Sequence, residues 1–147
     1  MNILESLGNP GYVLALVCAA FGSALGTSAA GMAALGAWKK CFLQNRNAPF
    51  ILVAFVGAPL SQTIYGMILM NAIKGAPETV SPLTKFTIGL LGGLAMGLSA
   101  WLQGKAGAMA CDALAETKKG FGNYIMVLGI IETVALFVMV FLMTTLR

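Results

Sequence analysis

The chain has 147 residues, of which 59% are hydrophobic and only 10% are charged, and its mean hydropathy is +0.87. A soluble domain carries about 25% charged residues, so this composition excludes an ordinary soluble protein and predicts an all-α membrane protein. The net charge of +4 is scattered, with no basic patch interleaved with aromatic residues, so nucleic acid is not an expected partner.

The chain contains four apolar stretches that each exceed the ~20 residues needed to cross the hydrocarbon core of a bilayer. We expect one membrane domain, residues 1–147, made of two tandem helical hairpins at 11–73 and 83–146. The four expected transmembrane helices cover about residues 11–38, 47–73, 83–115 and 120–146.

The basic residues set the expected orientation, because positively charged loops stay in the cytoplasm. The loops between the first two and the last two helices hold five Lys and Arg residues, and the opposite side holds three. We therefore expect a multi-pass protein of the cell membrane, with those two loops cytoplasmic and both termini outside. The five loop residues are Lys39, Lys40, Arg46, Lys118 and Lys119.

The two hairpins resemble one unit written twice in the same orientation. A shift of 76 positions places Ser23 on Ser99, and a shift of 72 places Leu60 on Glu132. One hairpin therefore keeps a carboxylate that the other lacks, which predicts one ion site per four helices. A parallel repeat of this kind disfavours the inverted-repeat transporters.

Small residues line the first and third expected helices. Gly22 and Gly26 form a GxxxG pattern, and Gly89, Gly93 and Gly97 form two more. Such faces let helices approach closely. Besides general membrane packing, they are compatible with a ring in which the thin first and third helices lie inside and the bulkier second and fourth outside.

Glu132 is the only charged residue between Lys119 and Arg147 and falls near the middle of the last expected helix. A carboxylate there costs roughly 2.5–3.5 kcal/mol on insertion scales. A membrane helix carries that cost only when a proton, a cation or a partner neutralises the group. The position therefore predicts a carboxylate that handles an ion at mid-membrane.

Polar side chains are expected to accompany Glu132 at the same depth. Gln103 lies as far before the last loop as Glu132 lies after it, and Ser61, Gln62 and Tyr65 share one face of the second helix. Interhelical hydrogen bonding alone is the other reading of the serine and the glutamines.

Pro59, in the second helix, has no N–H to donate. It is therefore expected to loosen the turn that precedes it and to free carbonyl oxygens over residues 55–58. A set of hard oxygen ligands with a single negative charge suits Na⁺. It contains too few carboxylates for a Ca²⁺ site.

At these residues the chain resembles the duplicated proteolipid of V-type (vacuolar and archaeal-type) rotary ATPases, subunit K or c, and its bacterial sodium-translocating members in particular. The resemblance covers essentially the whole chain. It is carried by the Gly-rich first helix and by three motifs: Pro-Leu-Ser-Gln-Thr-Ile-Tyr-Gly at 59–66, Gln-Gly-Lys at 103–105 and Ile-Glu-Thr at 131–133.

The resemblance implies a role for each site residue. Glu132 would carry the ion, and Tyr65 would donate a hydrogen bond that holds Glu132 closed. The remaining oxygens would come from the side chains of Gln103, Gln62 and Ser61 and from the backbone carbonyl of Ala58.

The resemblance also implies a rotor-ring subunit that carries Na⁺ or H⁺ as the transported ion during ATP synthesis or hydrolysis, without an organic cofactor. Its partners would be further copies of itself, a membrane stator subunit, a central-stalk subunit and the lipid bilayer. The chain contains no phosphate-binding loop, so it is not expected to be catalytic alone.

Two other functions remain open from the sequence. A small proton-coupled exporter of cationic drugs could use the same glutamate, but Trp38 and Trp101 lie away from Glu132 and no aromatic-lined cavity is evident. A scaffold that only packs in the membrane would tolerate Leu in place of Glu132.

Overall fold

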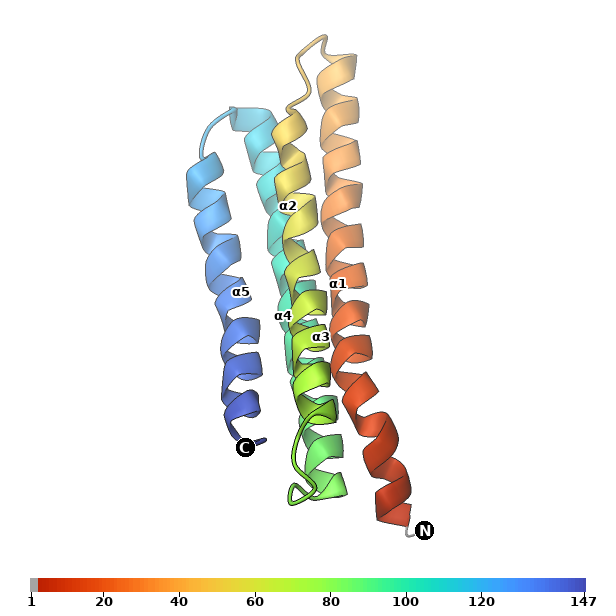
Figure 1. Ribbon diagram of the computed structural model, residues 1–147. Helices are drawn as coiled ribbons and strands as arrows, with labels where there is room; N and C mark the ends of the chain where they lie inside the picture. Colours follow the sequence, from red (N-terminus) through yellow and green to blue (C-terminus); the bar gives the residue numbers. More distant parts are fainter. Residues whose placement is uncertain (1–2) are drawn as a thin grey trace.

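The computed structural model describes the backbone of residues 3–147 and the side chains from residue 10 onward. Within that range every regular element is helical, and four long helical spans lie side by side (Figure 1). Each span is long and apolar enough to cross a membrane, which confirms the predicted all-α membrane fold. The spans are α1 (Ile3–Leu43), a composite second span over Phe50–Lys74, α4 (Pro82–Thr117) and α5 (Phe121–Thr144).

The second span is interrupted near its middle by Pro59. Because proline cannot donate a backbone hydrogen bond, the helix changes there to a tighter 3₁₀ turn. The span runs through a 3₁₀ turn at Phe50–Leu52, α2 (Val53–Gly57), a second 3₁₀ turn at Ala58–Leu60 and α3 (Ser61–Lys74).

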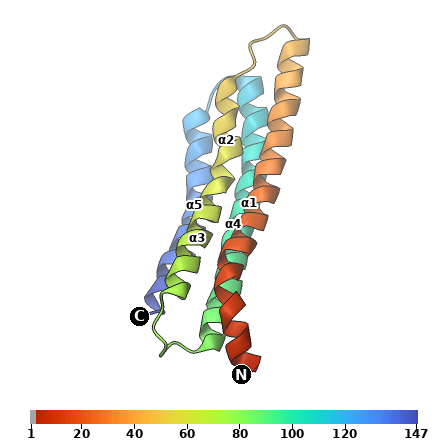
Figure 2. The ribbon, with the colours of Figure 1, turned by 45° about the vertical axis from the view of Figure 1, so that its right-hand side comes forward.

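The connections divide between the two ends of the bundle. The links from α1 to the second span and from α4 to α5 lie at one end, and the link from α3 to α4 lies at the other with both ends of the chain (Figures 1 and 2). Ser81 caps α4 by accepting a hydrogen bond from the backbone N–H of Thr84 at 3.1 Å. Lys118 and Gly120, both with positive φ, make the tight turn into α5.

The helices α1 and α4 meet backbone to backbone along their glycines. A Cβ atom added to Gly22 would lie 1.8 Å from the carbonyl oxygen of Gly97, and one on Gly104 would lie 2.1 Å from the Cα of Gly26. No side chain fits at such distances, so the small residues are required by the contact itself. The second span then packs onto α1, where a Cβ on Gly66 would lie 2.7 Å from the carbonyl oxygen of Ala15.

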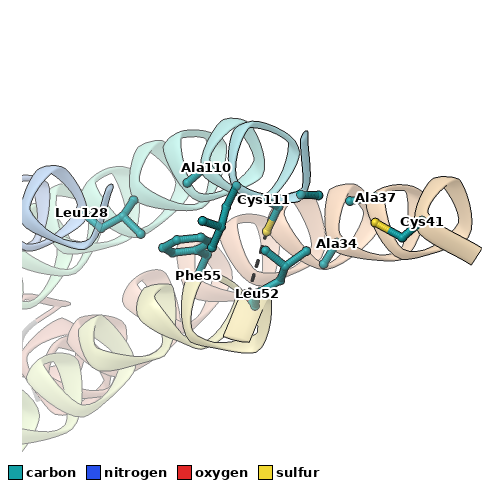
Figure 3. Close-up of a cluster of buried hydrophobic side chains, with 10 residues drawn as sticks. Ala34, Ala37, Cys41, Leu52, Phe55, Ala110, Cys111 and Leu128 are labelled. Carbon is teal, nitrogen blue, oxygen red and sulfur yellow. Dashed lines mark hydrogen bonds between the residues drawn. The ribbon is translucent and has the colours of Figure 1, made fainter. Parts of the chain in front are cut away.

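Two buried apolar clusters fill the bundle, one toward each end. The short-loop cluster, at the end with the two short connections, includes Phe55, Leu52 and Cys111 (Figure 3). The terminal cluster, at the end with both chain ends, comprises Ala15, Ala19, Leu69, Ile73, Ile88, Met96, Ala135, Met139 and Leu146. The space between the two clusters holds the polar residues of the candidate site.

Candidate ion-binding site

Glu132 lies midway along α5, half-buried, and its two carboxylate oxygens accept hydrogen bonds from two other helices. The hydroxyl of Tyr65 on α3 donates to Oε1 at 2.7 Å. The side-chain amide of Gln103 on α4 donates to Oε2 at 3.3 Å. The carboxylate thus joins α3 and α5 to α4.

The two glutamines form the buried centre of the site. Neither Gln62 nor Gln103 is exposed to any extent. The amide of Gln62 donates to Oε1 of Gln103 at 2.7 Å, and the amide of Gln103 donates to the carbonyl oxygen of Leu128 at 3.0 Å as well as to Glu132. Buried amides stay only where they are hydrogen-bonded, so this pair fixes how the three helices are arranged.

Ser61 begins α3 and connects the glutamines to the 3₁₀ turn. Its hydroxyl oxygen lies 3.1 Å from the carbonyl oxygen of Ala58 and 3.2 Å from Oε1 of Gln62. Because a hydroxyl has one hydrogen, it donates to one of these oxygens at a time. All six residues predicted from the sequence therefore lie in one connected chain of contacts. In order along that chain they are Ala58, Ser61, Gln62, Gln103, Glu132 and Tyr65.

The apolar clusters cover the site along the helix axes. On the short-loop side, the fully buried ring of Phe55 packs against Phe121 at 5.5 Å and Tyr124 at 6.2 Å between centroids. On the terminal side, Leu69 and Met96 are fully buried. Glu132 is partly exposed, so it reaches the surface of the protein sideways.

Among the side chains of residues 10–147, no lysine or arginine forms an ion pair with Glu132. Lys105, which follows Gln103 closely in sequence, is exposed and lies 4.8 Å from the centroid of the Trp101 ring. The same range holds no group of three or more His, Cys, Asp or Glu residues suited to a metal ion. A single carboxylate among neutral oxygens fits a proton or a monovalent cation better than a divalent one.

Two contacts beside Glu132 were not predicted from the sequence. Ser99 donates its hydroxyl to the carbonyl oxygen of Ile131 at 2.9 Å, and the carbonyl oxygen of Leu128 accepts from Gln103. The available signal was the spacing of Ser99 and Gln103, which lie one turn apart on the same face of α4.

The first hairpin has no such network at the equivalent positions. Leu60, the repeat equivalent of Glu132, is 52% exposed. The hydroxyls of Ser23 and Thr27, which fall on Ser99 and Gln103 after the shift of 76, are buried without a hydrogen-bond partner. That the two hairpins arose by duplication stays a prediction.

Two comparisons with known proteins agree with this architecture. The family model for the ATP synthase C subunit matches residues 86–144, which include Gln103 and Glu132. The A-type ATP synthase subunit K of Methanocaldococcus jannaschii is 33% identical over 131 residues, which cover 89% of this chain and 57% of the relative, so the chain spans little more than half of that protein. Together with the four membrane-length helices, these likenesses support a proteolipid of the V/A-type rotary ATPases.

Proposed function

We propose that this chain is a rotor-ring subunit of a rotary ATPase or ATP synthase that carries Na⁺ or H⁺ across the membrane on Glu132. The observation that carries this proposal is the carboxylate itself. It lies halfway along a membrane-length helix, accepts hydrogen bonds from Tyr65 and Gln103, and has no cationic side chain to neutralise it among the described residues. A transported ion supplies the missing positive charge.

Na⁺ is the ion that the donor set favours. The carboxylate of Glu132, the hydroxyl of Ser61, the carbonyl of Ala58 and the amide oxygens of the two glutamines are all hard oxygen ligands. For Na⁺ to bind them together, Ser61 must turn its hydrogen away from the ion, since its hydroxyl now donates to a neighbouring oxygen. Gln103 must likewise turn its amide, because its NH2 group now faces Glu132. A proton would need only Glu132, with its present hydrogen bonds rearranged.

The ion would enter and leave the site from the side of the bundle, perpendicular to the helix axes. The apolar clusters fill the interior on both sides of the site along those axes. Facing lipid, Glu132 would keep its ion, since a bare carboxylate there is costly. Beside a membrane stator subunit, an aqueous path and a basic residue would favour the bare carboxylate and displace the ion. ATP chemistry would then lie in partner subunits reached through a central stalk.

A ring is expected if the contact between α1 and α4 of one chain is repeated between α4 of one copy and α1 of the next. Within the chain, a Cβ on Gly93 of α4 would lie 3.0 Å from the Cα of Ala15 on α1. The two hairpins are related by a shift of 76 positions, so Leu91 is the equivalent of Ala15 and Val17 is the equivalent of Gly93. The equivalent contact between copies therefore pairs Leu91 of one copy with Val17 of the next. Both residues are exposed in the single chain, Leu91 by 58% and Val17 by 38%. The contact therefore propagates head to tail, and a closed ring satisfies every copy.

The groove between α4 and α5 offers the surface on which the adjacent copy would pack. Three apolar hollows of about 290, 220 and 330 Å³ follow one another between these helices. They are lined by bulkier side chains than the glycine contact inside the chain, so adjacent copies would stand farther apart than the two hairpins of one copy. The α4 residues in this lining are Leu91, Gly92, Ala95, Leu98, Ser99, Leu102, Ala106, Met109, Ala110 and Ala113.

The orientation of the chain is also part of the proposal. The end with the two short connections would face the cytoplasm, because most of the basic residues gather there. At that end Lys40 of α1 pairs with Glu116 of α4 on the surface. The end of α5 would then lie outside, as would the N-terminus, whose residues 1 and 2 lie outside the described residues.

The test is labelling of the purified, assembled protein with a hydrophobic carbodiimide, which attacks protonated carboxyls in apolar surroundings. We expect the label on Glu132 and expect Na⁺ to suppress it. Labelling that is indifferent to Na⁺ would make the carried ion a proton. Absence of label on Glu132 would contradict an ion-carrying carboxylate altogether.

A variant separates ion transport from packing. Glu132→Gln keeps the size of the side chain but removes its charge and replaces one of its two acceptor oxygens with an amide donor. In the assembled complex we expect it to abolish ion-coupled ATP hydrolysis. Coupled transport that survives this substitution would refute the proposal.

A further inference from the structure

We propose that Ser99 is a positioning residue for Glu132, holding α5 at the rotation that aims the carboxylate into the site. Ser99 lies on α4, is only 5% exposed and donates to the carbonyl oxygen of Ile131 at 2.9 Å. Ile131 directly precedes Glu132 in α5. Ser99 makes no hydrogen bond to the carboxylate or to the other proposed ion ligands, so it acts through the α5 backbone.

Ser99 supplies the second of two anchor points. One turn farther along α4, Gln103 donates to the carbonyl oxygen of Leu128 at 3.0 Å. A backbone carbonyl has two lone pairs, so both oxygens can accept these bonds without leaving their helical ones. One anchor constrains the α5 backbone at a single level, whereas two carbonyls one turn apart constrain it at two levels on the side that faces α4, directly before Glu132.

Rotation matters because the carboxylate reaches its partners over short distances. Each residue step in a helix turns the side-chain direction by about 100°, so even a fraction of that angle would move Glu132 off the hydroxyl of Tyr65, now 2.7 Å away. Gln103 donates both of its amide hydrogens to α5, but the bond to Glu132 holds a side chain, so Leu128 is its one anchor on the α5 backbone. Ser99 makes its side-chain hydrogen bond to α5 alone.

The first hairpin provides an internal comparison. Ser23, the repeat equivalent of Ser99, is 2% exposed, and its hydroxyl has no partner among the described residues. That hairpin carries Leu60 where the second carries Glu132. The interhelical serine hydrogen bond is thus present in the hairpin that carries Glu132 and absent at the equivalent Ser23 in the other.

The decisive experiment compares Ser99→Thr with Ser99→Val in the assembled protein. The two side chains have nearly the same shape, and only threonine keeps the hydroxyl. Ser99 borders a hollow of about 220 Å³ with Leu102 and Ile131, which the proposed ring places between copies. The two variants add side-chain atoms of nearly the same volume there, so the effect of the added bulk cancels in the comparison. The readouts are the rate of carbodiimide labelling of Glu132 at one pH without Na⁺, and the Na⁺ concentration that halves this rate.

We expect Ser99→Thr to match the unsubstituted protein. We expect Ser99→Val to label roughly threefold to tenfold faster and to need correspondingly more Na⁺ for protection, as the loss of one membrane hydrogen bond predicts. Ser23→Ala, which removes an unpartnered hydroxyl, should change neither readout. Equal behaviour of the threonine and valine variants would overturn the positioning role.

This inference rests on the proposed function, but the two fail in different ways. If Na⁺ protects no variant, sodium transport is wrong, and the difference between threonine and valine without Na⁺ still decides the role of Ser99. If Ser99→Val does not assemble, Ser99→Ala takes its place, since α4 already carries alanines on its packed faces. Labelling of that variant at the unsubstituted rate would overturn the proposal equally.

Discussion

At Glu132 the two oxygens of one carboxylate have different neighbours. Oε1 accepts a short hydrogen bond from Tyr65, which is not part of the buried amide pair, whereas Oε2 accepts a longer one from Gln103, which is. Breaking the first contact therefore leaves the hydrogen bond between the two glutamines in place. In the proposed site, Tyr65 is accordingly the residue that would open the site while the amide pair stays intact.

Tyr65→Phe is expected to weaken ion retention by about 1.5 kcal/mol, roughly tenfold in affinity, because a hydrogen bond to a charged group is lost. The measurement is Na⁺ protection of Glu132 against carbodiimide. Tyr124→Phe makes the same chemical change beside the short-loop cluster, where the ring packs on Phe55. If both variants shift the protection equally, the hydroxyl of Tyr65 does not hold the site closed.

The residues of the site were predictable because charge inside an apolar helix is rare and helical spacing fixes which side chains share a face. That reasoning placed Gln103 level with Glu132, and the structure brings them within 3.3 Å. It could not assign partners to serines, since a hydroxyl is as common in plain packing as in a functional contact. Ser99 and Ser23 occupy equivalent positions after the shift, and only the structure separates them.

At the scale of elements, the contact between α1 and α4 tolerates no side-chain atoms. Gly22→Ala is expected to destabilise the protein by about 1–3 kcal/mol, because its Cβ would overlap the Gly97 carbonyl and the two backbones would have to separate. Thermal unfolding in detergent measures the effect.

The control for that substitution lies in the same helix. A Cβ on Gly36 meets nothing within 4 Å, so Gly36→Ala should be neutral or slightly stabilising through its better helix propensity. Equal melting temperatures for the two variants would show that α1 and α4 are not in backbone contact at Gly22.

The elements themselves were predictable to different degrees. Four spans follow from hydropathy alone, because each must satisfy its own backbone hydrogen bonds in lipid. The glycine patterns predicted faces on the first and third spans that allow close approach, but not which helix or which glycine each face meets, since several arrangements would bury small residues equally well. At Pro59 the sequence predicted a loosened turn, and the structure adds its form, a 3₁₀ segment that places Ser61 at the start of α3.

At the scale of the whole molecule, cysteine pairs test the contact between copies. In a background in which the three native cysteines are alanine, Val17→Cys with Leu91→Cys should form a disulfide between copies and yield a ladder of covalent oligomers on a denaturing gel. In the proposed ring the two residues lie on opposite faces of the α1–α4 pair, so one copy cannot form this bond with itself.

The matched control pairs Val17→Cys with Leu102→Cys. Leu102 is exposed like Leu91 but lies three turns farther along α4, about 16 Å away. Only monomers and sporadic dimers are expected from it. A ladder from the control pair, or none from the test pair, would contradict the head-to-tail register.

Leu60, which occupies the position equivalent to Glu132, lowers the number of ions that the proposed rotor moves per ATP. In the proposed ring, four helices advance per ion, twice as many as in a ring whose every hairpin bears a carboxylate. A full turn then moves half as many ions for the same number of helices, and the free energy of each ATP is divided among fewer of them. One charge moved across 100 mV requires about 2.3 kcal/mol. A rotor with this low ion-to-ATP ratio can therefore pump ions against a steeper electrochemical gradient. For the same reason it needs a steeper gradient to synthesise ATP.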